Sequence, residues 1–97
     1  MEGESTRQLK VARQIQKDVA EIIRSKGMAA FDGALVSVSG VKISSDLAVA
    51  RIYVSIFPSN KQKGVLEIIN SMSKTIRGEL GRLVAKQFRI VPELIFS

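Results

Sequence analysis

The sequence predicts a single α+β domain whose elements follow in the order α-β-β-α-α-β. A long amphipathic helical pattern opens the chain, two segments of alternating residues follow it, and two helical stripes precede a β-rich end. The chain has 97 residues, of which 45% are hydrophobic and 25% are charged. This length allows one domain over residues 1–97, with 1–5 expected as a disordered N-terminus, and the apolar fraction is enough for a core.

The first predicted element is a helix over residues 6–25, with Ser5 or Thr6 as a plausible N-cap. Its apolar residues recur at helical spacing and fill one arc of a helical wheel, which predicts a buried face. Cationic residues fall together on the opposite arc and form a stripe: Arg7, Lys10, Arg13, Lys17 and Arg24.

A loop and an antiparallel hairpin are expected next. Residues 26–33 hold two glycines and no sustained period, so they predict a loop with at most one short turn, and Gly27 suits a helix C-cap. Residues 35–43 and 48–57 alternate in the way of half-buried strands, and the polar link 44–47 can close a turn between them.

Two helical stripes and a last strand complete the pattern. Apolar residues at 65–72 and again at 76–84 have helical spacing, but periodicity leaves open whether they form one bent helix or two. Residues 88–96 are β-rich, and Pro92 within them indicates an edge strand or a bulged strand.

Composition argues against most enzyme classes. The chain has no His and no Cys, so imidazole catalysis, thiol nucleophiles and His- or Cys-based metal sites are excluded. Its carboxylates are scattered, and it contains no glycine-rich nucleotide-binding fingerprint. We therefore expect no enzymatic activity, no cofactor, no metal and no small-molecule substrate. Without a signal peptide or a membrane-spanning run, the protein is expected to be soluble and cytoplasmic.

The charge balance points to a polyanionic partner. Fifteen Lys and Arg against nine Asp and Glu give a formal net charge of +6, which favours nucleic acid before an anionic membrane. The cationic stripe could be an ordinary solvated helix face, but few acids share its arc, so contact with phosphates is favoured. Asp18 and Glu21 are expected to pair with Lys17 and Arg24. Tyr53 and Phe57 are the only aromatic pair on one face of a strand, which disfavours an aromatic-rich RNA-binding sheet.

Four segments follow one another in a fixed order: SDL at 45–47, ARIYVS at 50–55, IRGELG at 76–81 and RIVPELIF at 89–96. A fifth, RQIQK at 13–17, precedes them. In this order the four segments resemble bacterial ribosome-binding factor A, and the fifth is similar to the first helix of that family. Each segment alone is a weak signal. Together they cover almost the whole chain from Arg7 to Phe96.

The resemblance implies a type II KH domain, in which a three-stranded sheet carries helices on one face. It also implies a monomeric, non-enzymatic assembly factor that binds small-subunit ribosomal RNA and the free, immature small subunit, assists late rRNA processing, and matters for cold adaptation. Carried over to this chain, the RNA-binding residues lie on the first helix and at the junction of the second and third helices: Arg7, Lys10, Arg13, Lys17, Ser73, Lys74 and Arg77.

One departure and one alternative accompany this prediction. The family commonly has an Ala-x-Gly kink at the helix junction, where this chain has Met72-Ser73-Lys74, so either Ser73 or Lys74 must tolerate the bend or the helices run more continuously. The alternative is a protein-interaction module without direct RNA binding, which an exposed apolar patch near Met28 and Phe31 would favour.

Overall fold

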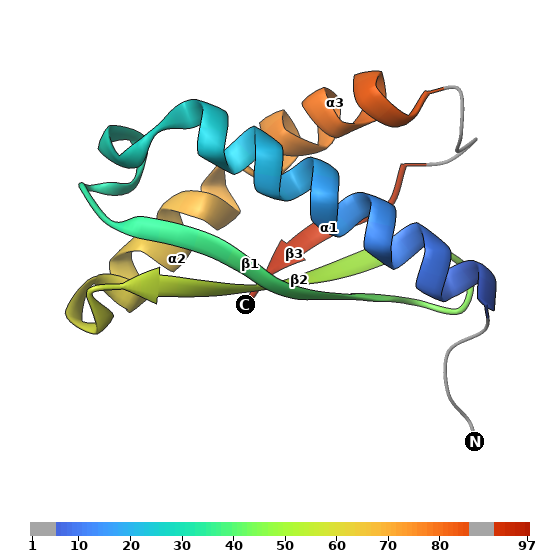
Figure 1. Ribbon diagram of the computed structural model, residues 1–97, viewed down its shortest axis with the longest axis horizontal. Helices are drawn as coiled ribbons and strands as arrows, with labels where there is room; N and C mark the ends of the chain where they lie inside the picture. Colours follow the sequence, from blue (N-terminus) through green and yellow to red (C-terminus); the bar gives the residue numbers. More distant parts are fainter. Residues whose placement is uncertain (1–5, 86–90) are drawn as a thin grey trace.

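The fold is known from a computed structural model, which describes residues 6–85 and 91–97 (Figure 1). Single-turn 3-10 helices at Met28–Phe31 and Ser59–Lys61 separate the longer elements. Those longer elements are α1 Thr6–Lys26, β1 Leu35–Ile43, β2 Val49–Phe57, α2 Gln62–Ser71, α3 Ser73–Val84 and β3 Glu93–Phe96. The expected disorder at 1–5, the possible cap at Ser5 and the predicted strand residues 88–90 lie outside the described residues.

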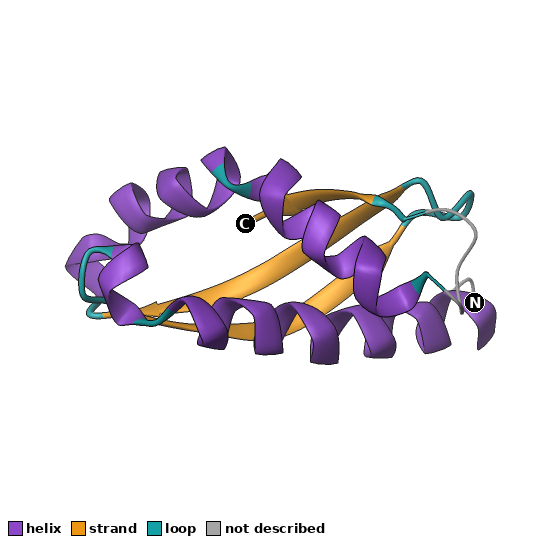
Figure 2. Cartoon of the chain, turned by 90° about the horizontal axis from the view of Figure 1, so that it is seen from above, coloured by secondary structure: helices purple, strands orange, loops and turns teal. Residues whose placement is uncertain are grey.

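The three strands form one sheet in the order β1-β2-β3, with β1 and β2 antiparallel and β2 and β3 parallel. All three helices cover the same face of this sheet, as Figures 1 and 2 show from two directions. The predicted α+β class, the element order and the one-sided helical layer are therefore confirmed.

Helix α1 packs its apolar stripe onto the sheet. Ile15 and Val19 are completely buried, and they meet the buried residues Ile52 of β2 and Leu80 of α3 in a single core. The helix ends at Lys26, one residue later than predicted, and Gly27 follows with a φ of 79°, which suits the predicted glycine C-cap.

The β1–β2 hairpin is confirmed, with one irregularity that the alternation did not predict. Ser39 is an extra residue in β1, because Val38 pairs with Val54 and Gly40 pairs with Tyr53. The turn at 44–47 is held by Asp46, whose carboxylate accepts hydrogen bonds from the Ser44 hydroxyl (2.7 Å) and the Ala48 backbone N–H (3.1 Å). These bonds, first the one from Ser44, lower the pKa of Asp46.

Helices α2 and α3 are two separate helices that meet at Met72. Met72 has φ −96° and ψ 4°, an allowed conformation that needs no glycine, and its backbone N–H still donates to Ile68 and Ile69. Ser73 is already the first residue of α3. The expectation that Ser73 or Lys74 would carry the bend is thus wrong, because the break lies one residue earlier.

Strand β3 is an edge strand, as Pro92 predicted, but it begins only at Glu93, directly after that proline. Its outer edge is occupied by the side chain of Asn70 from α2. The Asn70 amide donates to the Phe96 carbonyl (3.0 Å) and accepts from the Phe96 N–H (3.0 Å), as a neighbouring strand would.

Replacing Asn70 by Ala should destabilise the domain by roughly 1 to 2 kcal/mol, because two backbone groups of Phe96 lose their partners. Urea unfolding followed by circular dichroism measures the change. The matched control is Asn60→Ala, an exposed asparagine whose loss should leave stability unchanged within about 0.5 kcal/mol. Equal stabilities of the two variants would contradict the assigned role of Asn70.

Replacing Ser44 by Ala should raise the pKa of Asp46 toward its ordinary value, because the largest cause of the lowered pKa is removed. NMR titration of the Asp46 carboxyl measures it, with Ser45→Ala in the same turn as the control. Since the pKa is lowered on folding, this carboxylate stabilises the turn at neutral pH, and the contribution is lost as the pH falls through the lowered pKa. An Asp46 pKa that is unchanged in the Ser44→Ala variant would contradict this assignment.

Candidate nucleic-acid interface

The centre of the cationic stripe is formed by Lys10, Arg13 and Lys17 on the outer face of α1. All three side chains are exposed, and at about 100° per residue they lie opposite the buried Ile15 and Val19. Lys10 and Lys17 are separated by about 10 Å along the helix axis at roughly 1.5 Å per residue. Arg7 is exposed as well, but it lies at the flank of the stripe rather than at its centre.

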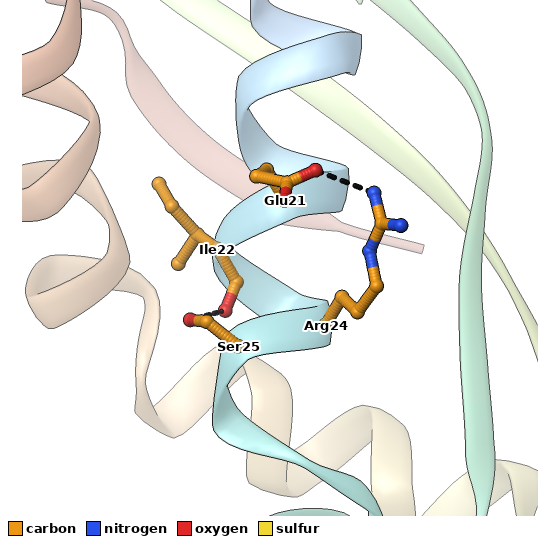
Figure 3. Close-up of polar contacts among 4 residues, drawn as sticks. All are labelled: Glu21, Ile22, Arg24 and Ser25. Carbon is orange, nitrogen blue, oxygen red and sulfur yellow. Dashed lines mark hydrogen bonds and ion pairs between the residues drawn. The ribbon is translucent and has the colours of Figure 1, made fainter.

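These four cations have no ion-pair partner among residues 6–85 and 91–97. The expected pairing of Asp18 with Lys17 is wrong, because the Asp18 carboxylate accepts a hydrogen bond from the Gln14 amide, one helical turn earlier (2.9 Å). Glu21 pairs with Arg24 as expected, which Figure 3 shows, so Arg24 is neutralised within its own helix. Lys10, Arg13 and Lys17 therefore offer cationic donors that no described acid neutralises, a set that suits phosphates.

The three predicted junction residues lie together around one open hollow of about 480 Å³. Ser73, Lys74 and Arg77 line it from α3, and Ala48, Val91, Glu93 and Leu94 line it from the sheet side. Lys74 is exposed and has no ion-pair partner in the described part of the chain, whereas Ser73 is half-buried.

Arg77 already has a structural task. Its Nε donates to the Pro92 carbonyl (3.0 Å) and its Nη2 to the Val91 carbonyl (2.7 Å), which ties α3 to the segment before β3. An arginine has five N–H donors, so the remaining donors of Arg77 are still available to a ligand in the hollow. Sequence reasoning did not find this tether, because Arg77 and Val91 are distant in the sequence and only the fold brings them together.

The two groups of predicted residues do not form one continuous site. Helix α1 runs along the β1 side of the sheet, whereas α2 and the start of α3 lie toward the β3 side (Figure 2). A ligand that contacts both groups must therefore reach across the helical layer.

Two cations outside the main candidates, Arg51 in the hairpin and Arg89 near the last strand, are expected from the sequence either as secondary RNA contacts or as residues that cover sheet edges. For Arg51 the edge interpretation is wrong, because it stands on the central strand β2, directly opposite Lys42 of β1. Lys42 and Arg51 both occupy positions in the alternating pattern that face away from the core. Predicting that they are opposite each other would have required the register of the hairpin. Arg89 lies outside the described residues.

Residues 6–85 and 91–97 contain no cluster of three or more potential metal-ligating side chains. No helix within them has the length and apolar character needed to cross a membrane.

The comparison with protein families decides the classification. The family model described as Ribosome-binding factor A matches residues 7–97. This chain belongs to the ribosome-binding factor A family. A ribosome-binding factor A of Cytophaga hutchinsonii is 40% identical over 93 residues, which cover 96% of this chain and 70% of the relative.

Structures of the family agree with the fold. The crystal structure of ribosome-binding factor A from Thermus thermophilus superposes with a TM-score of 0.79, covering 93% of both chains at 24% identity. A homology model of the T. thermophilus factor, fitted into a cryo-EM map of its complex with the 30S subunit, gives a TM-score of 0.71 at 26% identity, covering 88% of this chain and 87% of that one. The KH-like fold expected from the resemblance is confirmed.

Proposed function

We propose that this chain is a non-enzymatic assembly factor that binds the small ribosomal subunit through its ribosomal RNA. Membership in the ribosome-binding factor A family supports the proposal, as does the similarity to the homology model of the T. thermophilus factor fitted into the map of a 30S complex. The observation that carries it is the row of unpaired cations on α1, Lys10, Arg13 and Lys17. Unpaired exposed cations gain most from phosphates, because no internal salt bridge must be broken first.

In this proposal α1 docks onto the RNA backbone as a rigid rod. Its buried face is fixed in the core, so the three cations keep their spacing without help from the ligand. Binding releases counterions from the RNA, which supplies affinity without reading sequence. Arg7 extends the contact at the start of the helix.

The hollow at the helix junction gives the second RNA contact. Lys74 supplies a free ammonium group, Ser73 a hydroxyl group, and Arg77 the donors that its tether leaves unused. Glu93 lines the same hollow and repels phosphate from its far side, so the backbone of the RNA should pass on the α3 side of the hollow.

The finer role follows from the family resemblance. The factor acts in the cytoplasm as a monomer on the free, immature subunit, assists late rRNA maturation, and is important at low temperature. Holding an unfinished RNA segment in one conformation requires no catalytic group and no cofactor. Release then follows when a mature contact or another factor displaces the domain.

A protein-interaction module without RNA binding is the second candidate. It is favoured by an apolar hollow of about 380 Å³ between the end of α1 and β1, whose rim includes Met28 and Leu35, 53% and 55% exposed. Phe31 is buried and does not contribute to an exposed patch, so the patch that this alternative expected around Met28 and Phe31 is reduced to Met28 and its exposed neighbours.

The double variant Lys10→Glu/Lys17→Glu should fold normally, because neither side chain is packed, and should bind purified small subunits on the order of 100-fold more weakly. Co-sedimentation with 30S subunits through a sucrose gradient measures the loss, and circular dichroism verifies the fold. The matched control Lys63→Glu/Arg82→Glu makes the same change in net charge on α2 and α3, where both residues are also exposed.

Two results would contradict the proposal. Equal loss of binding in the two double variants would mean that net charge matters and the α1 surface does not. Undiminished binding of the Lys10→Glu/Lys17→Glu variant would exclude α1 as the docking surface. If binding were then lost on filling the apolar hollow with Ala20→Phe, the protein-interaction module would be favoured instead.

A further inference from the structure

The face of the sheet that the helices leave uncovered carries two cations beside the single tyrosine of the chain. Lys42 on β1 and Arg51 on β2 are directly opposite each other, and Tyr53 follows Arg51 on the same face of the central strand. All three side chains are exposed, with Tyr53 at 40%. This face is on the other side of the sheet from α1 and the helix junction (Figure 1).

The pairing of Lys42 with Arg51 is electrostatically unfavourable in the isolated domain. Like charges at directly opposite positions of an antiparallel pair destabilise a sheet. Neither cation has an ion-pair partner in the described part of the chain, and Arg51 donates only to the Ser97 hydroxyl (3.0 Å).

Two carboxylates lie near this pair without neutralising it. Glu93 shares the open face, but it is registered with Val49 rather than with Arg51, and the two make no ion pair. Asp46 in the adjoining turn is bound by Ser44 and Ala48. The charges of Lys42 and Arg51 therefore remain uncompensated, and a bound anion would reduce the repulsion between them.

The surface beside the tyrosine ring is open. The residue opposite Tyr53 is Gly40, and a Cβ atom built at this glycine would meet nothing within 4 Å. The bulge at Ser39 lies at the same point, where its hydroxyl bonds the Tyr53 carbonyl (3.1 Å) and changes the pleat of β1. A planar group can therefore lie against the Tyr53 ring above Gly40 without displacing a side chain.

We propose that this open face is a further nucleic-acid site, separate from α1 and the junction hollow, which holds one base of a single strand on Tyr53 and an adjacent phosphate between Lys42 and Arg51. An aromatic ring next to cations is the combination that binds single strands, because bases stack on the ring while cations follow the backbone. One ring supports one base, so the site is much smaller than an aromatic-rich sheet platform. It is independent of the α1 surface and would let one domain contact two RNA segments.

Tyr53 itself reports on this site, because the chain has one Tyr and no Trp. Titration of the full chain with hexa-adenylate RNA should quench its intrinsic fluorescence as a base stacks on the ring. Lys42→Gln/Arg51→Gln should weaken binding by roughly 10-fold or more, and Gly40→Val should abolish quenching because its side chain fills the space above residue 40. The matched control Lys63→Gln/Arg82→Gln should behave as the unmodified chain.

Two further measurements show whether each variant is folded and how tightly it binds RNA. Circular dichroism verifies each fold, and anisotropy of a labelled hexa-adenylate gives affinity for variants that lack the tyrosine. Tyr53→Phe should bind within about threefold of the unmodified chain, since phenylalanine also stacks, whereas Tyr53→Ser should bind on the order of 10-fold more weakly.

The outcomes distinguish this proposal from the one made for α1. Lys10→Glu/Lys17→Glu should lose 30S binding and still show quenching by hexa-adenylate. Binding without quenching, or unchanged affinity of Lys42→Gln/Arg51→Gln, would overturn the open-face site and leave the α1 surface untouched. Quenching by a hexaglutamate peptide and not by RNA would also overturn it, by assigning the face to an acidic protein segment.

Discussion

Burial of the apolar stripe of α1 against the sheet is the interaction on which the rest of this structure depends. A three-stranded sheet cannot bury enough apolar surface by itself, so the helices must supply the second layer of the core. Ile15 and Val19 of α1 are fully buried, and so are Ile76 and Leu80 of α3. Because all three helices lie on one side, the same arrangement leaves the outer faces of the helices and the opposite face of the sheet free for partners.

The free surfaces differ in what they can bind. The outer face of α1 carries cations in a fixed row with no aromatic neighbour, a set suited to phosphates of a folded RNA. The junction hollow combines Lys74 with an arginine that also holds the fold together. In the proposed function, binding therefore resides in charge placed on a rigid frame and requires no reactive group.

Much of the fold could be predicted because its signals are periodic and local. The helix at 6–25 and the strand at 35–43 agree with the structure to within one residue, since both alternate or repeat over many positions. The bulge at Ser39 and the break at Met72 could not be predicted, because each depends on one residue whose conformation is set by long-range packing. The late start of β3 at Glu93 has a local origin, because Pro92 directly before it has no N–H to donate to a strand ladder.

The candidate site could be predicted only in part. Periodicity alone placed Lys10, Arg13 and Lys17 on one exposed face, whereas Ser73, Lys74 and Arg77 came from the family resemblance. Their gathering around one hollow depends on β3, which the chain reaches only after α3. Asp18 bonds Gln14 rather than Lys17, and spacing along the helix does not determine which of these two neighbours it contacts.

The central claim is that unpaired cations on α1 bind RNA phosphates, and the salt dependence of affinity for purified 30S subunits tests it most directly. Each phosphate contact contributes roughly 0.7 to 0.9 to the slope of log affinity against log salt concentration. Lys10→Gln/Lys17→Gln should therefore reduce the steepness of that slope by about 1.4 to 1.8. A slope that is equally steep in the variant and the unmodified chain, or a flat one in both, would contradict the account.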